Sequence, residues 1–108
     1  MDSSFYDQVF ELVRLSPRGR VSSYGAIAKS LGAGGSARMV GYAMRHAGLA
    51  DVPVPAHRVV NSAGLLTGKF HFDPPERMQE LLIQEGLQVE NDKVKDFKKY
   101  FWNPLVEL

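Results

Sequence analysis

The stretch "SSYGAIAKSLGAGGSARMVGYAM", residues 22–44, predicts two short helices joined by a glycine-containing turn. One of the two leading serines can cap the first helix, Gly32 can end it, and "AGG" at 33–35 can form the turn. Ser36 can cap the second helix. The apolar face of that helix is formed by Met39, Val40, Ala43, Met44 and Ala47. These signals together predict a helix-turn-helix.

The outward faces of the second helix carry small residues and cations. Ala37 and Gly41 lie one turn apart, so a backbone could approach the helix closely there. Arg38, Tyr42 and Arg45 lie beside them, and arginines suit phosphates and grooves. The alternatives are close packing against a neighbouring helix for the small pair, and plain solvation for the cations. We interpret this helix as a DNA-binding element.

The net charge of +1 hides an uneven distribution. Between residues 12 and 72 the chain has one acidic residue, Asp51, and many basic ones. The basic ones are Arg14, Arg18, Arg20, Lys29, Arg38, Arg45, Arg58 and Lys69. Such a segment is either a solvated face or a footprint for a polyanion, because Lys and Arg displace counterions from phosphates. The candidate phosphate contacts are Arg18, Arg20, Lys29 and Arg45.

Length and composition exclude several classes of protein. A chain of 108 residues with no linker or repeat indicates a single domain over residues 1–108. The absence of cysteine excludes disulfides and any thiol nucleophile. No apolar run approaches the length of about 18 residues that a membrane span needs, and no signal-peptide pattern opens the chain. We therefore expect a cytoplasmic protein, associated with the nucleoid if it is prokaryotic.

The segments around the helix pair predict a mixed fold. Residues 3–15 have the spacing of a helix, which "SPRGR" at 16–20 ends. "HRVVNSAGLLTG" at 57–68 predicts a short strand, a turn over 61–64 and a second short strand.

The C-terminal third predicts one helix and a less regular tail. Asp73 is expected to cap a helix that runs to Glu85 and is stopped by Gly86. The tail predicts a hairpin-like segment followed by a short amphipathic helix. The expected fold class is mixed but mainly α, a winged helix-turn-helix-type domain.

The segment "PVPAHRVV", residues 53–60, places a histidine and an arginine in apolar surroundings, which suggests a site. The residue before His57 is Ala56, whose methyl group can do no chemistry. The segment therefore looks like a prepared site without a reactive centre.

Four motifs together resemble the DNA-binding domain of the O6-alkylguanine-DNA alkyltransferases. They are "VSSYGAIAKSLG", "ARMVGYAMR", "VPAHRVVNSAGLLTG" and "LLIQEGLQV". They occur in the family's order and cover roughly residues 5–90. The family's acceptor cysteine stands where this chain has Ala56. The chain therefore resembles the alkyltransferase-like proteins, which bind alkylated DNA without repairing it.

The resemblance implies a relic pocket with no catalytic residue. His57 matches the histidine that acts through water as the base for the thiol, and Glu85 matches the glutamate that orients it. Ala56 leaves the pair nothing to activate, so we expect a supporting polar pair without turnover. The resemblance implies no metal and no cofactor.

The resemblance also assigns DNA contacts. Tyr24 matches the tyrosine that crowds a phosphate and helps to rotate the nucleotide out, and Arg38 matches the finger that enters the vacated stack. Ala37 and Gly41 match the small residues that let the helix lie in the minor groove. Lys69 stands nearest to a basic residue that packs by the flipped base, and the family's asparagine after the second helix is not evident. Arg45 completes the expected DNA-binding set.

The expected function is to bind O6-alkylguanine in duplex DNA by flipping the nucleotide, without alkyl transfer. The resemblance implies that the complex, formed by a monomer, recruits nucleotide excision repair. One alternative is a helix-turn-helix transcriptional regulator that reads an operator. Another is a hydrolase that uses His57 and Glu85 on a water molecule.

Overall fold

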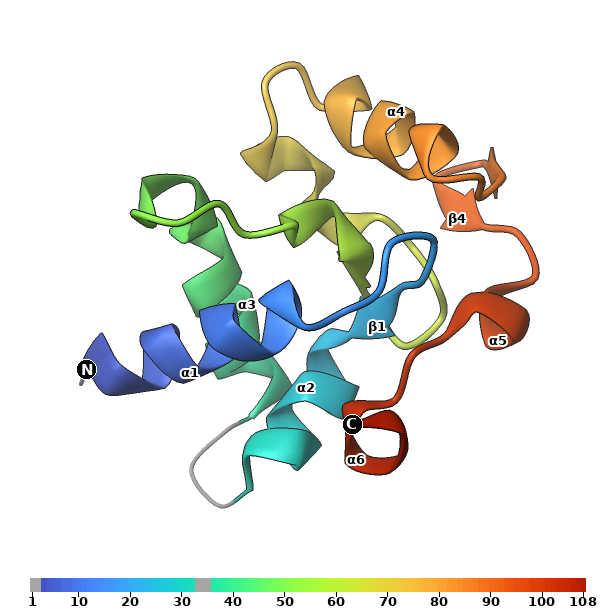
Figure 1. The fold of residues 1–108 in the computed structure, drawn as a ribbon. Helices are drawn as coiled ribbons and strands as arrows, with labels where there is room; N and C mark the ends of the chain where they lie inside the picture. The colour runs from blue at the N-terminus through green and yellow to red at the C-terminus, as the bar shows by residue number, and fades with distance from the viewer. Residues whose placement is uncertain (1–2, 33–35) are drawn as a thin grey trace.

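Three helices form the N-terminal half of the molecule (Figure 1). The computed structural model describes residues 3–32 and 36–108. The α1 helix spans Ser3–Arg14, α2 spans Tyr24–Leu31 and α3 spans Ala37–Arg45. The α1 helix packs against both α2 and α3, which contact each other extensively. The predicted helix-turn-helix is therefore present as α2 and α3, supported by α1.

The predicted caps of both helices and the end of the first at Gly32 are confirmed, but α3 ends at Arg45, so Ala47 lies beyond the helix to which its apolar face was assigned. The Ser23 hydroxyl accepts a hydrogen bond from the N–H of Ala26 at 3.1 Å, and Ser36 accepts one from Met39 at 3.2 Å. Gly32 ends α2 with a φ of +82°, a conformation in which glycine has no steric penalty. The turn expected at 33–35 lies outside the described residues.

A two-residue parallel pairing connects the helix pair to the rest of the molecule. Strand β1, Ser22–Ser23, lies beside strand β2, Val59–Val60, with Ser22 opposite Val59. Because β1 leads directly into α2, and β2 directly follows His57 and Arg58, the pairing fixes α2 beside that polar segment.

The remaining elements are short. The 3₁₀ helices are η1 Ala47–Leu49, η2 Ala56–Arg58 and η3 Thr67–His71. They are followed by α4 Glu76–Gln84, the antiparallel strands β3 Val89–Glu90 and β4 Lys93–Val94, α5 Phe97–Tyr100 and α6 Pro104–Glu107. The hairpin and short helix predicted for the tail are confirmed, and α6 is an additional element.

Two local predictions were wrong. The turn at 61–64 forms, with the Gly64 N–H donating to the Asn61 carbonyl at 2.9 Å, but no second strand follows. Leu65 makes a single bridge to Lys93, and the chain then enters η3. Asp73 does not cap α4, which begins at Glu76 after two prolines. Proline has no N–H to donate to a capping side chain, so this start of the helix offers Asp73 fewer donors.

The core consists of two clusters separated by the β1–β2 pair. One cluster joins α1, α2 and α3 and includes Val59. The other lies under α4 and the C-terminal hairpin and includes Val60. Adjacent residues of a strand point to opposite faces, so β2 contributes one valine to each cluster. The mainly helical, winged architecture agrees with the predicted class. Among the residues described, no helix combines the length and apolar character needed to cross a membrane.

Candidate nucleic-acid interface

The start of α3 presents an open surface. Ala37 and Arg38 are exposed, and Gly41, one turn further along, is half-buried. Apart from the helix's own nearby backbone and the two adjacent residues, a Cβ placed on Gly41 would meet no described atom within 4 Å. Glycine inside a helix costs about 1 kcal/mol relative to alanine, and no packing contact in the described structure offsets that cost. The missing side chain at Gly41 therefore leaves room on the surface of α3, and it is not needed for packing against another helix.

The structure divides the eight basic residues of the central segment into two groups. Five of them bind the protein itself, among them Arg18, which donates to the Gln84 carbonyl, and Arg20, which donates to Phe101 and pairs with Glu107. The remaining three members of this first group are Arg14, Arg58 and Lys69, which also bind groups of the protein. Arg18 and Arg20 were candidate phosphate contacts in the sequence, and this stays a prediction for two guanidinium groups that also bind the protein itself.

The second group consists of Lys29, Arg38 and Arg45, all on the helix-turn-helix. Lys29 and Arg38 make no hydrogen bond or ion pair with any residue in the described ranges. Arg45 likewise makes none there, and its guanidinium lies over the Tyr42 ring at 5.4 Å. Within residues 12–72, the positive charge that the described structure leaves unpaired is thus concentrated on α2 and α3.

Behind the helix pair, three charged or polar side chains converge. His57 Nε2 lies 2.5 Å from Glu85 Oε2, and the Arg58 guanidinium donates to both oxygens of the same carboxylate at 3.0–3.1 Å. The Glu85 side chain is only 5% exposed, so the carboxylate depends on these partners for its charge. The structure thus brings His57 and Glu85 together, as the family resemblance implied.

The pKa values of Glu85 and His57 determine which of the two carries a proton. Burial alone would raise the pKa of Glu85, but hydrogen bonds from Arg58, Gly19 and His57 outweigh it and lower the pKa to about 2. Burial lowers the pKa of His57 below its ordinary value, against the opposing effect of Glu85. Glu85 is therefore ionised and can only accept, so the neutral His57 donates its Nε2–H. Nδ1 of His57 keeps its lone pair, the feature that a base requires.

Two partners of this cluster were missed in the sequence. The N–H of Gly19 donates to Glu85 Oε1 at 2.8 Å, and Arg58 also donates to the Ser16 carbonyl at 2.8 Å. Both belong to the "SPRGR" segment, which looked like a simple helix breaker. The loop therefore binds the carboxylate through Oε1, whereas the histidine binds Oε2.

Ala56 begins the same 3₁₀ helix that carries His57 and Arg58. Its methyl group is half-buried and packs against the first core cluster. No cysteine occurs in the chain, so no thiol is available next to His57. The arrangement can hold a neutral imidazole and a carboxylate in order, but it offers nothing on which an alkyl group could be carried.

Tyr24 and the loop after the turn lie together. Tyr24 is the first residue of α2, half-buried against the first core cluster, and its hydroxyl would lie 2.9 Å from a Cβ on Gly68. Only a glycine at 68 allows this approach without displacement. Lys69, next along η3, pairs with Asp92 at 2.6 Å and lies over the Phe70 ring at 5.2 Å. In this structure Lys69 is therefore directed to the C-terminal hairpin.

Comparisons with known proteins agree with this arrangement. The family model of the 6-O-methylguanine DNA methyltransferase DNA-binding domain matches residues 4–87. Alkyltransferase-like protein 1 of Schizosaccharomyces pombe is 35% identical over 104 residues, which cover 93% of this chain and 95% of that protein. A DNA base-flipping protein of Escherichia coli is 34% identical over 104 residues, covering 94% of this chain and 77% of that protein.

A solved structure shows the same likeness in three dimensions. The crystal structure of the S. pombe protein in complex with damaged DNA containing O6-carboxymethylguanine matches with a TM-score of 0.80 at 34% identity. The match covers 94% of this chain and 97% of that one. The similarity thus extends well beyond the helix-turn-helix, into the C-terminal segment.

Proposed function

This chain belongs to the alkyltransferase-like branch of the 6-O-methylguanine DNA methyltransferase family, and from that premise we propose how it acts. It binds O6-alkylguanine in duplex DNA, turns the damaged nucleotide out of the stack and holds it without transferring the alkyl group. It is not an alkyltransferase, because the chain contains no cysteine to accept the group.

The observation that carries this proposal is that the hydrogen-bonded pair of His57 and Glu85 is present, while the preceding residue, Ala56, has only a methyl group. His57 and Glu85 keep the hydrogen bond and protonation states suited to activating a nucleophile, while Ala56 supplies none. A damaged base held beside Ala56 would keep its alkyl group, because no nucleophile is present there. Extrusion is required because the whole edge of a base cannot be read inside the stack.

We assign the interface to the start of α3. The open surface at Ala37 and Gly41 would let the helix lie in the minor groove, with Arg38 filling the place of the extruded base. Tyr24 would crowd the rotated phosphate, and Arg45 would contact the backbone. Lys69 would reach the base only after leaving Asp92, so we rank it below the others.

Several wider features belong to the same proposal. The protein acts as a monomer and as one domain over residues 1–108, in the cytoplasm or at the nucleoid of a prokaryote. The complex with the lesion then serves as a mark that nucleotide excision repair proteins recognise. A bent duplex with one base extruded is an unusual shape, which supports recognition by a further protein.

The decisive experiment compares two duplexes of identical sequence, one of which carries a single O6-methylguanine. Binding should favour the alkylated duplex by at least roughly tenfold, about 1.4 kcal/mol, because a damaged pair costs less to open. Fluorescence anisotropy at fixed salt measures both constants, and 2-aminopurine placed opposite or beside the lesion reports extrusion. Equal affinities would contradict the proposed function.

The same samples separate the two alternatives. A transcriptional regulator would prefer an operator sequence over an alkylated duplex of arbitrary sequence. A hydrolase using His57 and Glu85 would release product over several turnovers. Recovery of unchanged O6-methylguanine after long incubation, together with lesion preference in unrelated sequences, would exclude both.

A further inference from the structure

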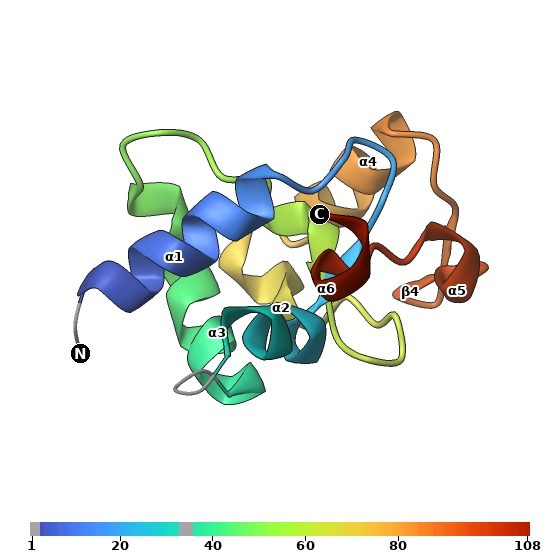
Figure 2. The same ribbon diagram turned by 60° about the horizontal axis from the view of Figure 1, so that its bottom comes forward.

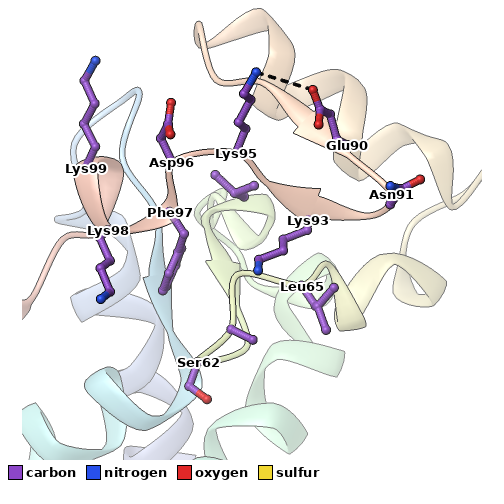
Figure 3. Close-up of a pocket in the computed structure, with 12 residues that line it drawn as sticks. Ser62, Leu65, Glu90, Asn91, Lys93, Lys95, Asp96, Phe97, Lys98 and Lys99 are labelled. Atoms are coloured by element: carbon purple, nitrogen blue, oxygen red, sulfur yellow. Dashed lines mark ion pairs between the residues drawn. The ribbon is translucent and has the colours of Figure 1, made fainter.

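A groove of about 1050 Å³ lies between the turn after β2 and the C-terminal segment (Figure 3). One wall is formed by Ser62, Ala63 and Leu65, and the other by residues 90–91 and 93–99. Four lysines line the second wall, at positions 93, 95, 98 and 99. Neither the polar cluster at Glu85 nor the start of α3 contributes a residue to this groove.

The two walls are locked together. Glycine is required at position 64, where φ is +85° and a Cβ would lie 3.0 Å from the Phe97 ring. The Val94 N–H donates to the Gly64 carbonyl at 2.9 Å, and the Leu66 N–H donates to the Asp92 carbonyl at 2.8 Å. The hairpin β3–β4 and helix α5 are therefore held against the 61–65 turn by backbone hydrogen bonds and by the packing of Phe97 on Gly64.

The lysines do not all point in the same direction. In Figure 3 the side chains of Lys93 and Lys98 extend toward the side of the groove where Ser62 lies, whereas Lys95 and Lys99 extend away from it. Lys95 pairs with Glu90 at 3.6 Å. Lys99 lies over the Tyr100 ring at 5.3 Å. Lys93 and Lys98 make no ion pair within residues 3–32 and 36–108.

The 61–65 turn lies along the same edge of the molecule as α2 and α3. Figure 2 shows this edge at the bottom of the view, where the yellow-green turn continues the line of the two helices. A duplex that contacts α3 extends beyond it in both directions. Lys93 and Lys98 are thus placed where a neighbouring stretch of phosphate backbone would pass.

We propose that this groove is a second DNA-backbone site, in which Lys93 and Lys98 bind phosphates that flank the nucleotide held at α3. The inference rests on the proposed DNA binding, and it adds a contact surface contributed by the C-terminal segment. A duplex is favoured over an acidic peptide because Phe97, the aromatic side chain of the groove, already packs against Gly64. The groove therefore offers cations but lacks a free aromatic anchor of the kind that peptide hot spots use.

The test measures how the DNA association constant depends on salt for Lys98→Gln and for Lys99→Gln. These adjacent residues differ in direction but share one helix, so Lys99→Gln is the matched control. Loss of one phosphate contact should reduce the log–log salt slope by about 0.9. The advantage of the wild type over Lys98→Gln should then shrink about 3.5-fold when salt rises fourfold. Lys93→Gln should behave like Lys98→Gln, and Lys99→Gln like the wild type.

A second variant tests the other wall. Ser62→Glu places a carboxylate on the exposed turn and should weaken binding to alkylated and plain duplexes by the same factor. Thermal unfolding of each variant confirms that the fold is intact, and all four substituted positions are exposed.

The outcomes separate the two levels of the proposal. Equal slopes for all variants, with lesion preference retained, would overturn the second site alone. Lack of lesion preference in the wild type would overturn the proposed function, whatever the slopes. Equal slopes combined with reduced binding of poly-glutamate by Lys98→Gln would assign the groove to an acidic protein segment and overturn the DNA site.

Discussion

Replacing Glu85 by Gln should destabilise the fold strongly at neutral pH and only weakly in acid. The substitution keeps the shape of the side chain but removes the charge that Arg58, Gly19 and His57 support with hydrogen bonds. It also leaves the Arg58 guanidinium, 14% exposed, without its counter-ion. Removing one partner of a buried pair is costly because the remaining charge stays desolvated.

The pKa of Glu85 sets the magnitude of this effect. Lowering it from 4.5 to about 2 corresponds to about 3 kcal/mol of folding free energy, since each tenfold change in ionisation is worth about 1.4 kcal/mol. The folded-state pKa lies below the unfolded value, so the unfolded chain takes up the proton first as the pH falls. The contribution is therefore complete above about pH 5 and declines as the pH approaches 2. At pH 3 about 2 kcal/mol of it is gone.

Urea unfolding of the wild type and Glu85→Gln at pH 7 and pH 3 measures the difference directly. We expect a gap of about 3 kcal/mol at pH 7 and about 1 kcal/mol at pH 3. Glu80→Gln is the matched control, because Glu80 lies on α4, the helix that Glu85 ends, and within the described residues it makes only an exposed pair with Arg77. A gap that is the same at both pH values, or below about 1 kcal/mol at pH 7, would refute the electrostatic reasoning.

Three further outcomes are expected. Arg38→Ala should weaken binding to the alkylated duplex more than to the plain one, whereas Lys29→Ala should weaken both alike in the same anisotropy titration. If Arg38→Ala lowers the affinity for both duplexes by the same factor, Arg38 is only a phosphate contact. Gly41→Ala should raise the unfolding free energy by about 1 kcal/mol, because the added methyl group meets no described atom within 4 Å apart from the helix's own nearby backbone and the two adjacent residues, while it weakens DNA binding. A melting temperature of Gly41→Ala below that of the wild type would contradict the claim that the space beside Gly41 is free. Ala56→Cys should give a thiol with a pKa below about 8.5 beside His57, and slow single-turnover methyl transfer detected by intact mass. An ordinary thiol pKa and no adduct, despite tight lesion binding, would show that His57 and Glu85 do not activate this position.

Local signals in the sequence predicted the helix-turn-helix well. Serine caps at Ser23 and Ser36 and the glycine at position 32 act within one helical turn, so the residues that determine these ends are visible in the sequence. The cap at Asp73 failed for an equally local reason, because prolines replace the donors it needs.

The cluster around Glu85 was only half predictable. The pairing of His57 with Glu85 came from the family resemblance, since no local rule joins residues so far apart. The contribution of Gly19 depends on a backbone N–H brought in from a loop 66 residues away, for which the side-chain pattern carries no signal. Likewise, charge counting could not separate Arg20, which is bound to the C-terminal segment, from Arg38.

The identity of residue 56 determines how often one molecule can be used. A protein that accepts an alkyl group on its own side chain is spent after one event, so the damage it handles is limited by how many copies are made. The methyl group of Ala56 makes no bond to Glu85, whose partners are Gly19, His57 and Arg58. The protein therefore keeps the pair of His57 and Glu85 without a side chain that is used up by alkyl transfer. Each molecule can leave one site and search for the next. The rate of departure, rather than the supply of protein, then sets the time for which any single site stays occupied.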